Sequence, residues 1–299
     1  MIEVKNLTKY FGAKAALDDV TFTASESCVY GLVGSNGAGK STLLRLLSGV
    51  YQADKGSISY GGKAVFDNPD VKERIAFVPD ELYFPTAATL KSMASLYKAA
   101  YKSFDKERFA SITEAYGLSV SAGINTFSKG MRRQAATALA LSVRPKYLFL
   151  DETFDGLDPV VRQLTKQLIY NDMAENGTTV IISSHSLKEL EESCDRLALL
   201  HNGKVVLDDD AQELQSGYFK VQIAFETERS EEFFAKESPI GFRQAGTVST
   251  FIVRGDREAV EARLKAMSPL LLDILPLSLE EVFVCKLGEL GYNFNQLGL

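Results

Sequence analysis

The chain has 299 residues, of which 45% are hydrophobic and 24% are charged, and its formal net charge is −6 at pH 7. This length and apolar content favour one large folded domain with a smaller one beside it, and they exclude general disorder. The acidic balance argues against a surface built chiefly to neutralise nucleic-acid phosphates, so we expect no nucleic-acid partner.

The cysteines and the first residues point to a reducing compartment. Cys28, Cys194 and Cys285 are odd in number and lack the spacing of metal ligands, so we interpret them as ordinary reduced thiols. The N-terminus lacks a basic stretch followed by an apolar one, and no apolar run approaches the ~20 residues that span a bilayer. We expect a chain that is neither secreted nor membrane-spanning.

The first strong pattern is a strand, a glycine-rich turn and a helix. Short apolar alternations run through residues 2–33 and end in the run Val29-Tyr-Gly-Leu-Val33, which is typical of a buried strand. Leucines at helical spacing follow Lys40 and stop at Gly49, which indicates a helix with one apolar side.

The middle of the chain predicts an inserted helical lobe at about residues 85–140. Apolar residues at helical spacing predict two amphipathic helices within 89–117, separated near Asp105. Beyond Lys146, buried-strand runs at 147–150 and 179–182 flank a helix, as in a parallel sheet with crossover helices. We therefore expect one α/β domain over residues 1–216, interrupted by the lobe.

A new pattern begins after Gly217. Alternating apolar residues at 219–225, a strand at 250–253 and helices at 230–236 and 256–267 predict a small α+β domain over 217–299. Dimerisation, regulation, a permease contact and plain packing are all open as its role. Residues 292–299 carry too little apolar patterning for a prediction.

The segment from Gly34 to Ser41 fits the phosphate-loop pattern G-x-x-x-x-G-K-[ST], between a predicted strand and a predicted helix. Its backbone N–H groups and the positive end of the helix suit phosphate oxygens. Lys40 adds a charge at the β- and γ-phosphates, and the Ser41 hydroxyl can ligate Mg²⁺. The residues expected to bind ATP here are Gly34, Ser35, Asn36, Gly37, Ala38, Gly39, Lys40, Ser41 and Thr42.

An acidic pair, Asp151-Glu152, ends the predicted strand at 147–150, where ligands collect in open α/β sheets. We expect Asp151 to hold the Mg²⁺ shell. Glu152 is then placed to orient the attacking water or accept its proton, because phosphoryl transfer depends mainly on positioning and charge stabilisation.

The order of the motifs resembles that of ABC ATPases. Phe127-Ser-Lys-Gly-Met131 stands before the acidic pair as the signature sequence of that family does, Gly156-Leu-Asp-Pro159 follows the pair, and His185 ends the next strand. The resemblance covers about residues 1–210. It implies an α/β P-loop NTPase (RecA-like) core with an antiparallel β subdomain and an inserted helical lobe, followed here by the α+β appendix.

The resemblance also implies roles for single residues. Phe11 would stack on the adenine, and His185 would contact the γ-phosphate and help to hold the attacking water. Ser128 and Gly130 would contact the γ-phosphate of ATP held by the opposite subunit of a head-to-tail dimer, with Asp158 at that interface. His201, which precedes a turn, is interpreted as structural.

The implied cofactors are ATP and Mg²⁺, and the implied partners are separately encoded membrane permease subunits and a second ATPase subunit. The dimer would be a homodimer or a heterodimer with a related ATPase. The chain would then be cytoplasmic, peripheral on the inner face of the cell membrane through the permease.

Two departures from the family pattern concern the site. Asp80 stands where glutamine is usual, and it is expected to ligate Mg²⁺ or hold a water although its negative charge alters the electrostatics. In the signature, Phe127, Lys129 and Met131 replace the usual residues, while Ser128 and Gly130 are kept. This looser signature and the segment 278–283 resemble a bacterial branch of drug and antibiotic exporters.

The resemblance implies an ATP-hydrolysing subunit that energises a membrane permease. Two other functions compete with this one. A non-transport ABC ATPase acting on nucleic acid or ribosomes tends to have two ATPase domains or a long coiled-coil insertion, whereas this chain has one set of motifs and no sustained heptads. A regulatory protein that binds ATP without hydrolysing it is disfavoured by the presence of Lys40, Asp151, Glu152 and His185, although Asp80 keeps that alternative open.

Overall fold

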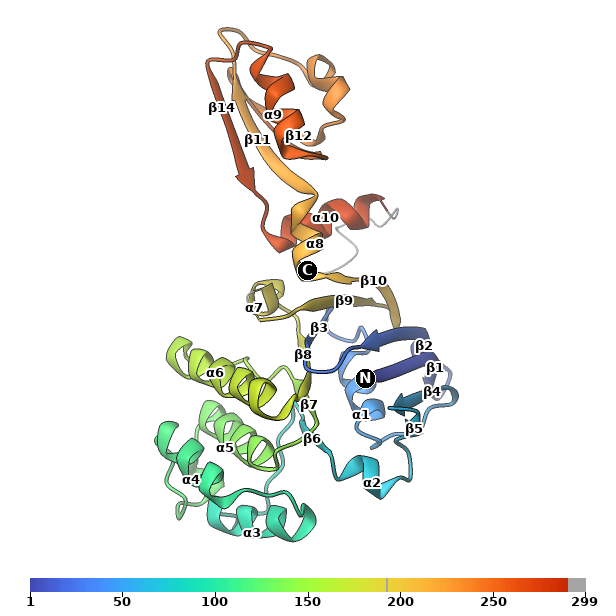
Figure 1. The fold of residues 1–299 in the computed structure, drawn as a ribbon, viewed down its shortest axis with the longest axis vertical. Helices are drawn as coiled ribbons and strands as arrows, with labels where there is room; N and C mark the ends of the chain where they lie inside the picture. Colours follow the sequence, from blue (N-terminus) through green and yellow to red (C-terminus); the bar gives the residue numbers. More distant parts are fainter. Residues whose placement is uncertain (192, 290–299) are drawn as a thin grey trace. The chain divides into compact units, whose positions relative to one another are not determined.

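A computed structural model describes residues 1–191 and 193–289 of the chain (Figure 1). These residues form two compact units, one from Met1 to Asp208 and one that begins at Asp209. The second unit thus starts eight residues before the boundary expected from the sequence, because α8 (Ala211–Ser216) packs with α10 (Leu279–Glu289) of that unit.

The first unit contains a six-stranded, mainly parallel sheet that carries the site. In spatial order its strands are β10 (Lys204–Asp210), β9 (Arg196–His201), β3 (Val29–Val33), β8 (Thr179–Ser184), β7 (Tyr147–Asp151) and β6 (Ile75–Val78). The neighbours from β9 to β6 run parallel, and β3, β7 and β8 are buried along their whole length. The three predicted buried strands are therefore confirmed, and their carboxyl ends share one edge.

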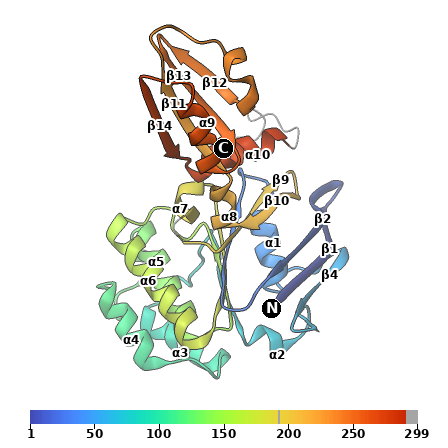
Figure 2. The ribbon, with the colours of Figure 1, turned by 45° about the horizontal axis from the view of Figure 1, so that its top comes forward.

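A second sheet of the first unit is antiparallel. Its strands are β2 (Lys14–Ala24), β1 (Ile2–Phe11), β4 (Lys55–Tyr60) and β5 (Lys63–Ala64), in that order across the sheet. The end of β2 alternates between buried and exposed residues, because one face packs on the core and the other faces solvent. Its buried side chains share an apolar cluster with the leucines of α1 (Lys40–Leu47), which lies beside this sheet in Figure 2.

The helical lobe lies between β6 and β7 along the chain. Its helices are α3 (Leu90–Ala100), α4 (Lys106–Ala115) and α5 (Lys129–Ser142). Thr89 and Ser92 cap α3 reciprocally, and Asp105 caps α4 by accepting from the backbone N–H of Arg108 at 2.8 Å. The predicted break near Asp105 is confirmed. The remaining short helices are α2 (Pro69–Lys72), a 3₁₀ turn (Ile124–Thr126) and α7 (Leu187–Glu191).

The second unit is an antiparallel sheet with helices on one face. Its strands, β12 (Ile240–Ala245), β13 (Val248–Arg254), β11 (Tyr218–Ala224) and β14 (Leu271–Pro276), lie in that order across the sheet. The segment expected to be a helix at 230–236 is a 3₁₀ helix (Glu231–Glu237), and the next is α9 (Arg257–Lys265). The chain order and the strand order together give a split βαβ arrangement of the ferredoxin type.

Two further findings concern the cysteines and the helices. No disulfide joins Cys28, Cys194 and Cys285, which are all buried among the described residues, and burial raises the pKa of the Cys28 thiol to about 11. Among residues 1–191 and 193–289, no helix combines the length and the apolar character needed to cross a bilayer.

α6 (Pro159–Asn176) is tied to the lobe through a fully buried carboxylate. Arg108 of α4 contacts Asp172 Oδ1 at 2.6 Å, yet Asp172 Oδ2 has no hydrogen-bond partner. The effect of burial on the pKa therefore exceeds that of the Arg108 charge, and the pKa of Asp172 rises from 3.8 to about 6.

The sign of this shift predicts how stability depends on pH. The folded state holds a proton that the unfolded chain releases, so this residue's contribution to the free energy of unfolding falls as pH rises from about 3.8 to about 6. Urea titrations of the wild type and Asp172→Asn between those pH values should show their difference in stability changing in that direction. A pH-independent difference would contradict the burial argument.

Candidate functional site

The glycine-rich loop joins β3 to α1 at the carboxyl edge of the parallel sheet. A side chain at Gly34 would place its Cβ 2.4 Å from the Leu200 carbonyl oxygen, and one at Gly39 would place it 2.6 Å from the Ala16 carbonyl oxygen. Gly39 also has a φ of 110°, a conformation that only glycine adopts readily. The loop can curl this tightly because its glycines lack side chains.

Lys40, the first residue of α1, is only 5% exposed and bridges the loop to the acidic pair. Its Nζ donates to the Gly34 carbonyl oxygen at 2.5 Å and lies 3.2 Å from Glu152 Oε1. Such partners compensate an ammonium group for the loss of contact with water on burial.

Glu152 is held at both ends by residues of other segments. Its φ is +47°, which is uncommon for a residue with a side chain, and its N–H donates to Ser183 Oγ at 3.0 Å. Its Oε2 lies 2.9 Å from His185 Nδ1 and accepts from the His185 N–H at 3.3 Å. The carboxylate therefore stands between Lys40 and His185, which the sequence separates by 145 residues.

Asp151 is fully buried and has one oxygen to spare. Ser183 donates its hydroxyl to Asp151 Oδ1 at 2.6 Å, whereas Oδ2 has no hydrogen-bond partner. Sequence reasoning missed Ser183, although the polar pair Ser183-Ser184 that ends an apolar strand was a usable signal. No group of three or more histidine, cysteine or acidic side chains in the described part of the chain could hold a metal alone.

The glycine-rich loop, Lys40 and Glu152 line a cavity of about 290 Å³ on the carboxyl edge of the sheet, whereas Asp151 and His185 are not among its lining residues. It is lined by Phe11, Lys14, Ala16, Ser35, Asn36, Gly37, Ala38, Gly39, Lys40, Ser41, Thr42, Asp80 and Glu152. Phe11 comes from the end of β1, is half exposed and meets the Tyr51 ring edge-on, with ring centroids 5.6 Å apart. Its position beside the loop leaves an aromatic face available to a flat ring.

Asp80 lies at this cavity and forms an ion pair with the signature helix. Arg133 of α5, which is 1% exposed, donates from Nη2 to Asp80 Oδ1 at 2.6 Å. The same guanidinium lies 3.8 Å from Asp155 Oδ2. The aspartate that replaces the usual glutamine is thus charge-compensated from within the chain.

Ser128 and Gly130 lie away from the cavity of their own chain. Ser128 caps α5 by accepting from the Met131 N–H at 3.2 Å, and a Cβ at Gly130 would lie 3.1 Å from the Gly156 carbonyl oxygen. Beside them Lys129 contacts Asp155 at 2.8 Å, and this hydrogen bond lowers the pKa of Asp155. Neither Ser128 nor Gly130 lines the cavity at Lys40.

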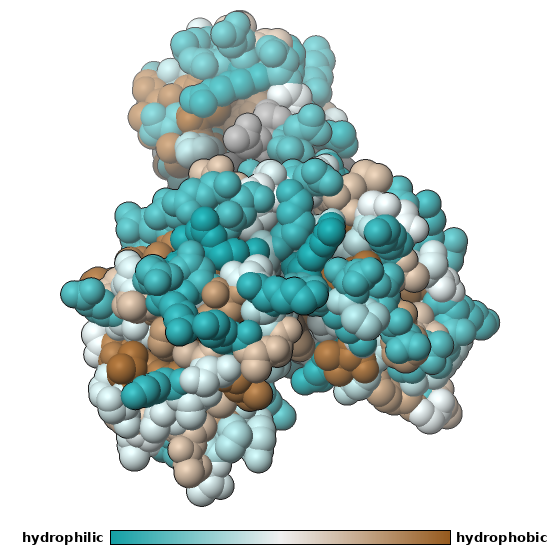
Figure 3. All heavy atoms as spheres, turned by 60° about the horizontal axis from the view of Figure 1, so that its bottom comes forward, coloured by the Kyte–Doolittle hydropathy of each residue, from teal (hydrophilic) through white to brown (hydrophobic). Residues whose placement is uncertain are grey.

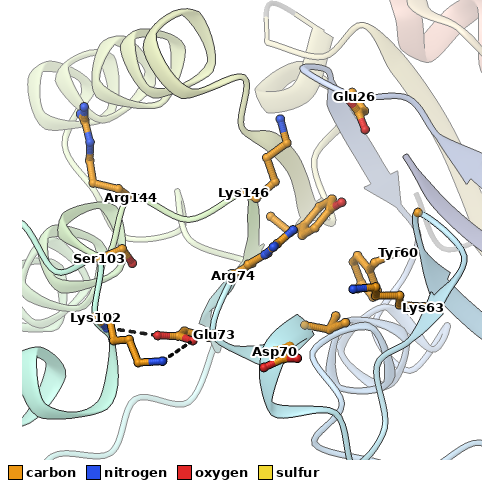
Figure 4. A pocket seen from close by; sticks show the side chains of 13 residues that line it. Glu26, Tyr60, Lys63, Asp70, Glu73, Arg74, Lys102, Ser103, Arg144 and Lys146 are labelled. Carbon is orange, nitrogen blue, oxygen red and sulfur yellow. Dashed lines mark hydrogen bonds and ion pairs between the residues drawn. The ribbon is translucent and has the colours of Figure 1, made fainter.

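A larger cavity of about 680 Å³ lies at the opposite, amino-terminal ends of β6 and β7 (Figure 4). Basic side chains such as Arg74 and Lys146 line it, and Lys102 reaches across to Glu73 at 3.5 Å. Figure 3 shows the first unit hollowed between the helical lobe and the part that carries α2. None of the residues expected to act on ATP lies there, so its size does not make it the site.

Comparison with known proteins agrees with the geometry. Residues 17–155 match the family model described as "ABC transporter". The chain is 31% identical over 288 residues, 96% of this chain and 98% of the relative, to the ABC transporter ATP-binding protein YtrB of Bacillus subtilis. It is 32% identical to the linearmycin resistance ATP-binding protein LnrL of the same organism, over 69% of this chain and 68% of the relative.

Solved structures give the same fold. A structure described as the ATP-binding subunit of an ABC transporter is 28% identical, with a TM-score of 0.67, and the match covers 72% of this chain and 92% of that one. A dimeric ATP-binding cassette bound to ADP and Pi is 22% identical, with a TM-score of 0.64 over 71% of this chain and 99% of that one. On the full-length match to a relative, the chain belongs to the family of ABC transporter ATP-binding proteins, as its motifs indicate.

Proposed function

We propose that this ATPase subunit works as a head-to-tail dimer, requires Mg²⁺, and energises a separately encoded membrane permease for export. The observation that carries the proposal is the Glu152 carboxylate, fixed between Lys40 and His185 beside the phosphate loop. This arrangement joins a phosphate-binding cation to a group able to accept a proton, as ATP hydrolysis requires.

The residues divide the work of hydrolysis. Lys40 and the loop N–H groups bind and orient the phosphates. Glu152 accepts a proton from, or orients, the attacking water, and its hydrogen bonds to Ser183 and His185 fix it for that task. His185, whose side chain is 55% exposed and contacts Glu152 at 2.9 Å, would contact the γ-phosphate. Phe11 stacks on the adenine.

The chain's oxygen groups fit Mg²⁺. This ion is usually held by one or two carboxylates, with waters and substrate phosphates completing an octahedron. The unpartnered, buried Asp151 Oδ2 supports such a role, and Ser41 contributes a hydroxyl at the loop. When bound, Mg²⁺ neutralises charge that develops on the transferred phosphoryl group.

Asp80 joins the magnesium shell or holds a water with its second oxygen, while Arg133 neutralises its charge. One carboxylate oxygen accepts from Arg133, and Asp80 is one of the residues that line the cavity. Because Arg133 compensates its charge, Asp80 repels the phosphates of ATP less than an unpaired carboxylate would. The ion pair also ties the strand β6 to α5 of the lobe, through which ATP binding can move the lobe.

The positions of Ser128 and Gly130 support a shared site. Both stand at the N-terminus of α5, whose positive end favours an anion, yet neither lines the cavity of its own chain. Facing a second subunit, they would complete that subunit's ATP site. The dimeric cassette with ADP and Pi supports this arrangement by its similar fold.

The proposed permease partner and the proposed direction of transport are supported by the names of the relatives. Proteins named for linearmycin resistance and for lantibiotic transport are among them, which supports export. Large apolar side chains, Tyr83 and Leu96, are exposed on the lobe and could meet a permease. The subunit would then work at the cytoplasmic face of the membrane. The motif content and acidic charge disfavour the alternative of a non-transport ATPase on nucleic acid.

Replacing Glu152 tests the proposed chemistry. Glu152→Gln should lower Mg-ATP turnover by about 10²–10⁴-fold, because proton acceptance is lost, while ATP is still bound and traps a dimer. Phosphate release and sedimentation with ATP measure the two effects. Lys40→Ala is the control that loses ATP binding. Unchanged turnover in Glu152→Gln would refute the catalytic assignment.

Removing Arg133 tests charge compensation at Asp80. Arg133→Met should weaken ATP binding roughly fivefold, since an uncompensated carboxylate then faces the phosphates. Asp80→Asn added to it should recover most of the loss. Calorimetric titration of ATP in the Glu152→Gln background measures both. Arg132→Met is the matched control, because Arg132 donates to the Phe127 carbonyl instead. Equal binding by Arg133→Met and Arg132→Met would contradict the argument.

A further inference from the structure

The sheet of the second unit has one covered face and one open face. The covered face presents Phe219, Val221 and Phe251 to an apolar cluster that also contains Val260 of α9 and Phe234 of the 3₁₀ helix. Because side chains alternate along a strand, the residues between them point to the other side. Leu271 and Leu275 on that side are 46% and 39% exposed, respectively.

The pairing register fixes which residues of the open face are neighbours. One row across the sheet runs from Asp273 through Gln222 and Thr250 to Arg243. The row on one side of it contains Leu275, Lys220, Ile252 and Ile240. The row on its other side contains Leu271, Ala224, Val248 and Ala245. The face is thus polar along the middle row, apolar along one outer row, and apolar except for Lys220 along the other.

Two opposite charges at the ends of the middle row have no partner in the described part of the chain. Asp273 lies on the edge strand β14 and Arg243 on the edge strand β12, both exposed, and neither side chain forms a hydrogen bond or ion pair with a described residue. Lys220, by contrast, pairs with Glu281 of α10. The uncompensated charges therefore sit at opposite edges of an apolar face.

This charge pattern is complementary to a copy of itself. When two such sheets stack face to face about a two-fold axis parallel to the strands, the edge strand β14 of each lies over β12 of the other. Asp273 of each copy then faces the partner's Arg243, so two such pairs form across the spacing of about 10 Å that stacked sheets keep. Leu275 faces the partner's Ile240 in the same arrangement, so these two apolar side chains meet as well.

A two-fold axis across the strands gives the opposite result. It places each strand over its own copy, so that Asp273 meets Asp273 and Arg243 meets Arg243, and like charges repel. Electrostatics thus select one of the two symmetric stackings. An isologous contact of this kind needs no second protein, because one surface supplies both halves.

The face is small for a stable interface. Four strands about 4.8 Å apart and about 20 Å long cover on the order of 400 Å² per copy, or about 800 Å² in total. Stable interfaces bury about 1,200–2,000 Å². A contact of this size is weak alone, and it gains strength when another contact already holds the two chains together.

We infer that the open face of the β12-β13-β11-β14 sheet is a self-association surface, on which two copies of the chain stack with reciprocal Asp273–Arg243 ion pairs. It supplements the proposed ATP-dependent dimer and keeps the subunits paired when that dimer opens. The inference extends the proposed function but does not depend on hydrolysis.

Charge reversal in the full chain tests this surface. Without nucleotide, sedimentation velocity over a protein concentration series should show a weak wild-type dimer. Asp273→Arg and Arg243→Asp should each raise its dissociation constant about tenfold, because two attractive pairs become repulsive. An equimolar mixture of the two variants should regain association as a heterodimer, and the double variant should regain it alone. Glu258→Arg, an exposed site on α9, is the matched control and should change nothing.

Several outcomes would overturn the inference. A wild type that stays monomeric up to about 1 mM, the weakest range of specific binding, would do so. Single reversals that behave like Glu258→Arg would do so as well. A double variant that associates as poorly as the single ones would exclude the strand-parallel axis. The ATP-trapped dimer of Glu152→Gln is measured separately, so a failure here leaves the proposed function intact, and a loss of that dimer alone leaves this surface intact.

Discussion

The site depends on one electrostatic constraint, the placement of the Glu152 carboxylate between two groups that come from distant segments. Lys40 holds Oε1 at 3.2 Å and His185 holds Oε2 at 2.9 Å. Neither contact is local, so each requires the parallel register of β3, β7 and β8. The buried strands are therefore the scaffold that sets the distance between the Lys40 ammonium and the Glu152 carboxylate. The unusual φ of Glu152 shows that the backbone itself is turned to meet this demand.

Much of this site could be predicted from the sequence, because its residues lie at the ends of strands with strong apolar runs. The loop from Gly34 to Ser41 can be recognised in the sequence because it has glycines where a Cβ would not fit. Contacts between distant side chains leave no such trace. Ser183 joins Asp151 to Glu152, and Arg133 joins Asp80 across 53 residues, through packing that periodicity cannot reveal. The 3₁₀ form of 231–237 was also beyond pattern reasoning, since its apolar spacing resembles that of an α-helix.

Both units carry opposite charges on separate elements, but they place these charges differently. In the first, opposite charges from separate elements meet inside one chain, as Arg133 and Asp80 do. In the second, Asp273 and Arg243 stand at opposite edges of one sheet, and their side chains have no partner among the described residues. The first unit also leaves Ser128 and Gly130 outside its own cavity. Each unit thus carries groups that a second copy of the chain would complete.

The central claim, that an active site is built from Lys40 of one subunit and Ser128 of the other, is tested most directly by mixing two inactive variants. Lys40→Ala and Ser128→Arg should each lack Mg-ATP hydrolysis alone. In a mixed head-to-tail dimer, one site takes Lys40 from one chain and Ser128 from the other, and both are wild type. Hydrolysis that appears on mixing is the result expected. Two variants that stay inactive together, while still forming mixed dimers, would contradict a site shared between subunits.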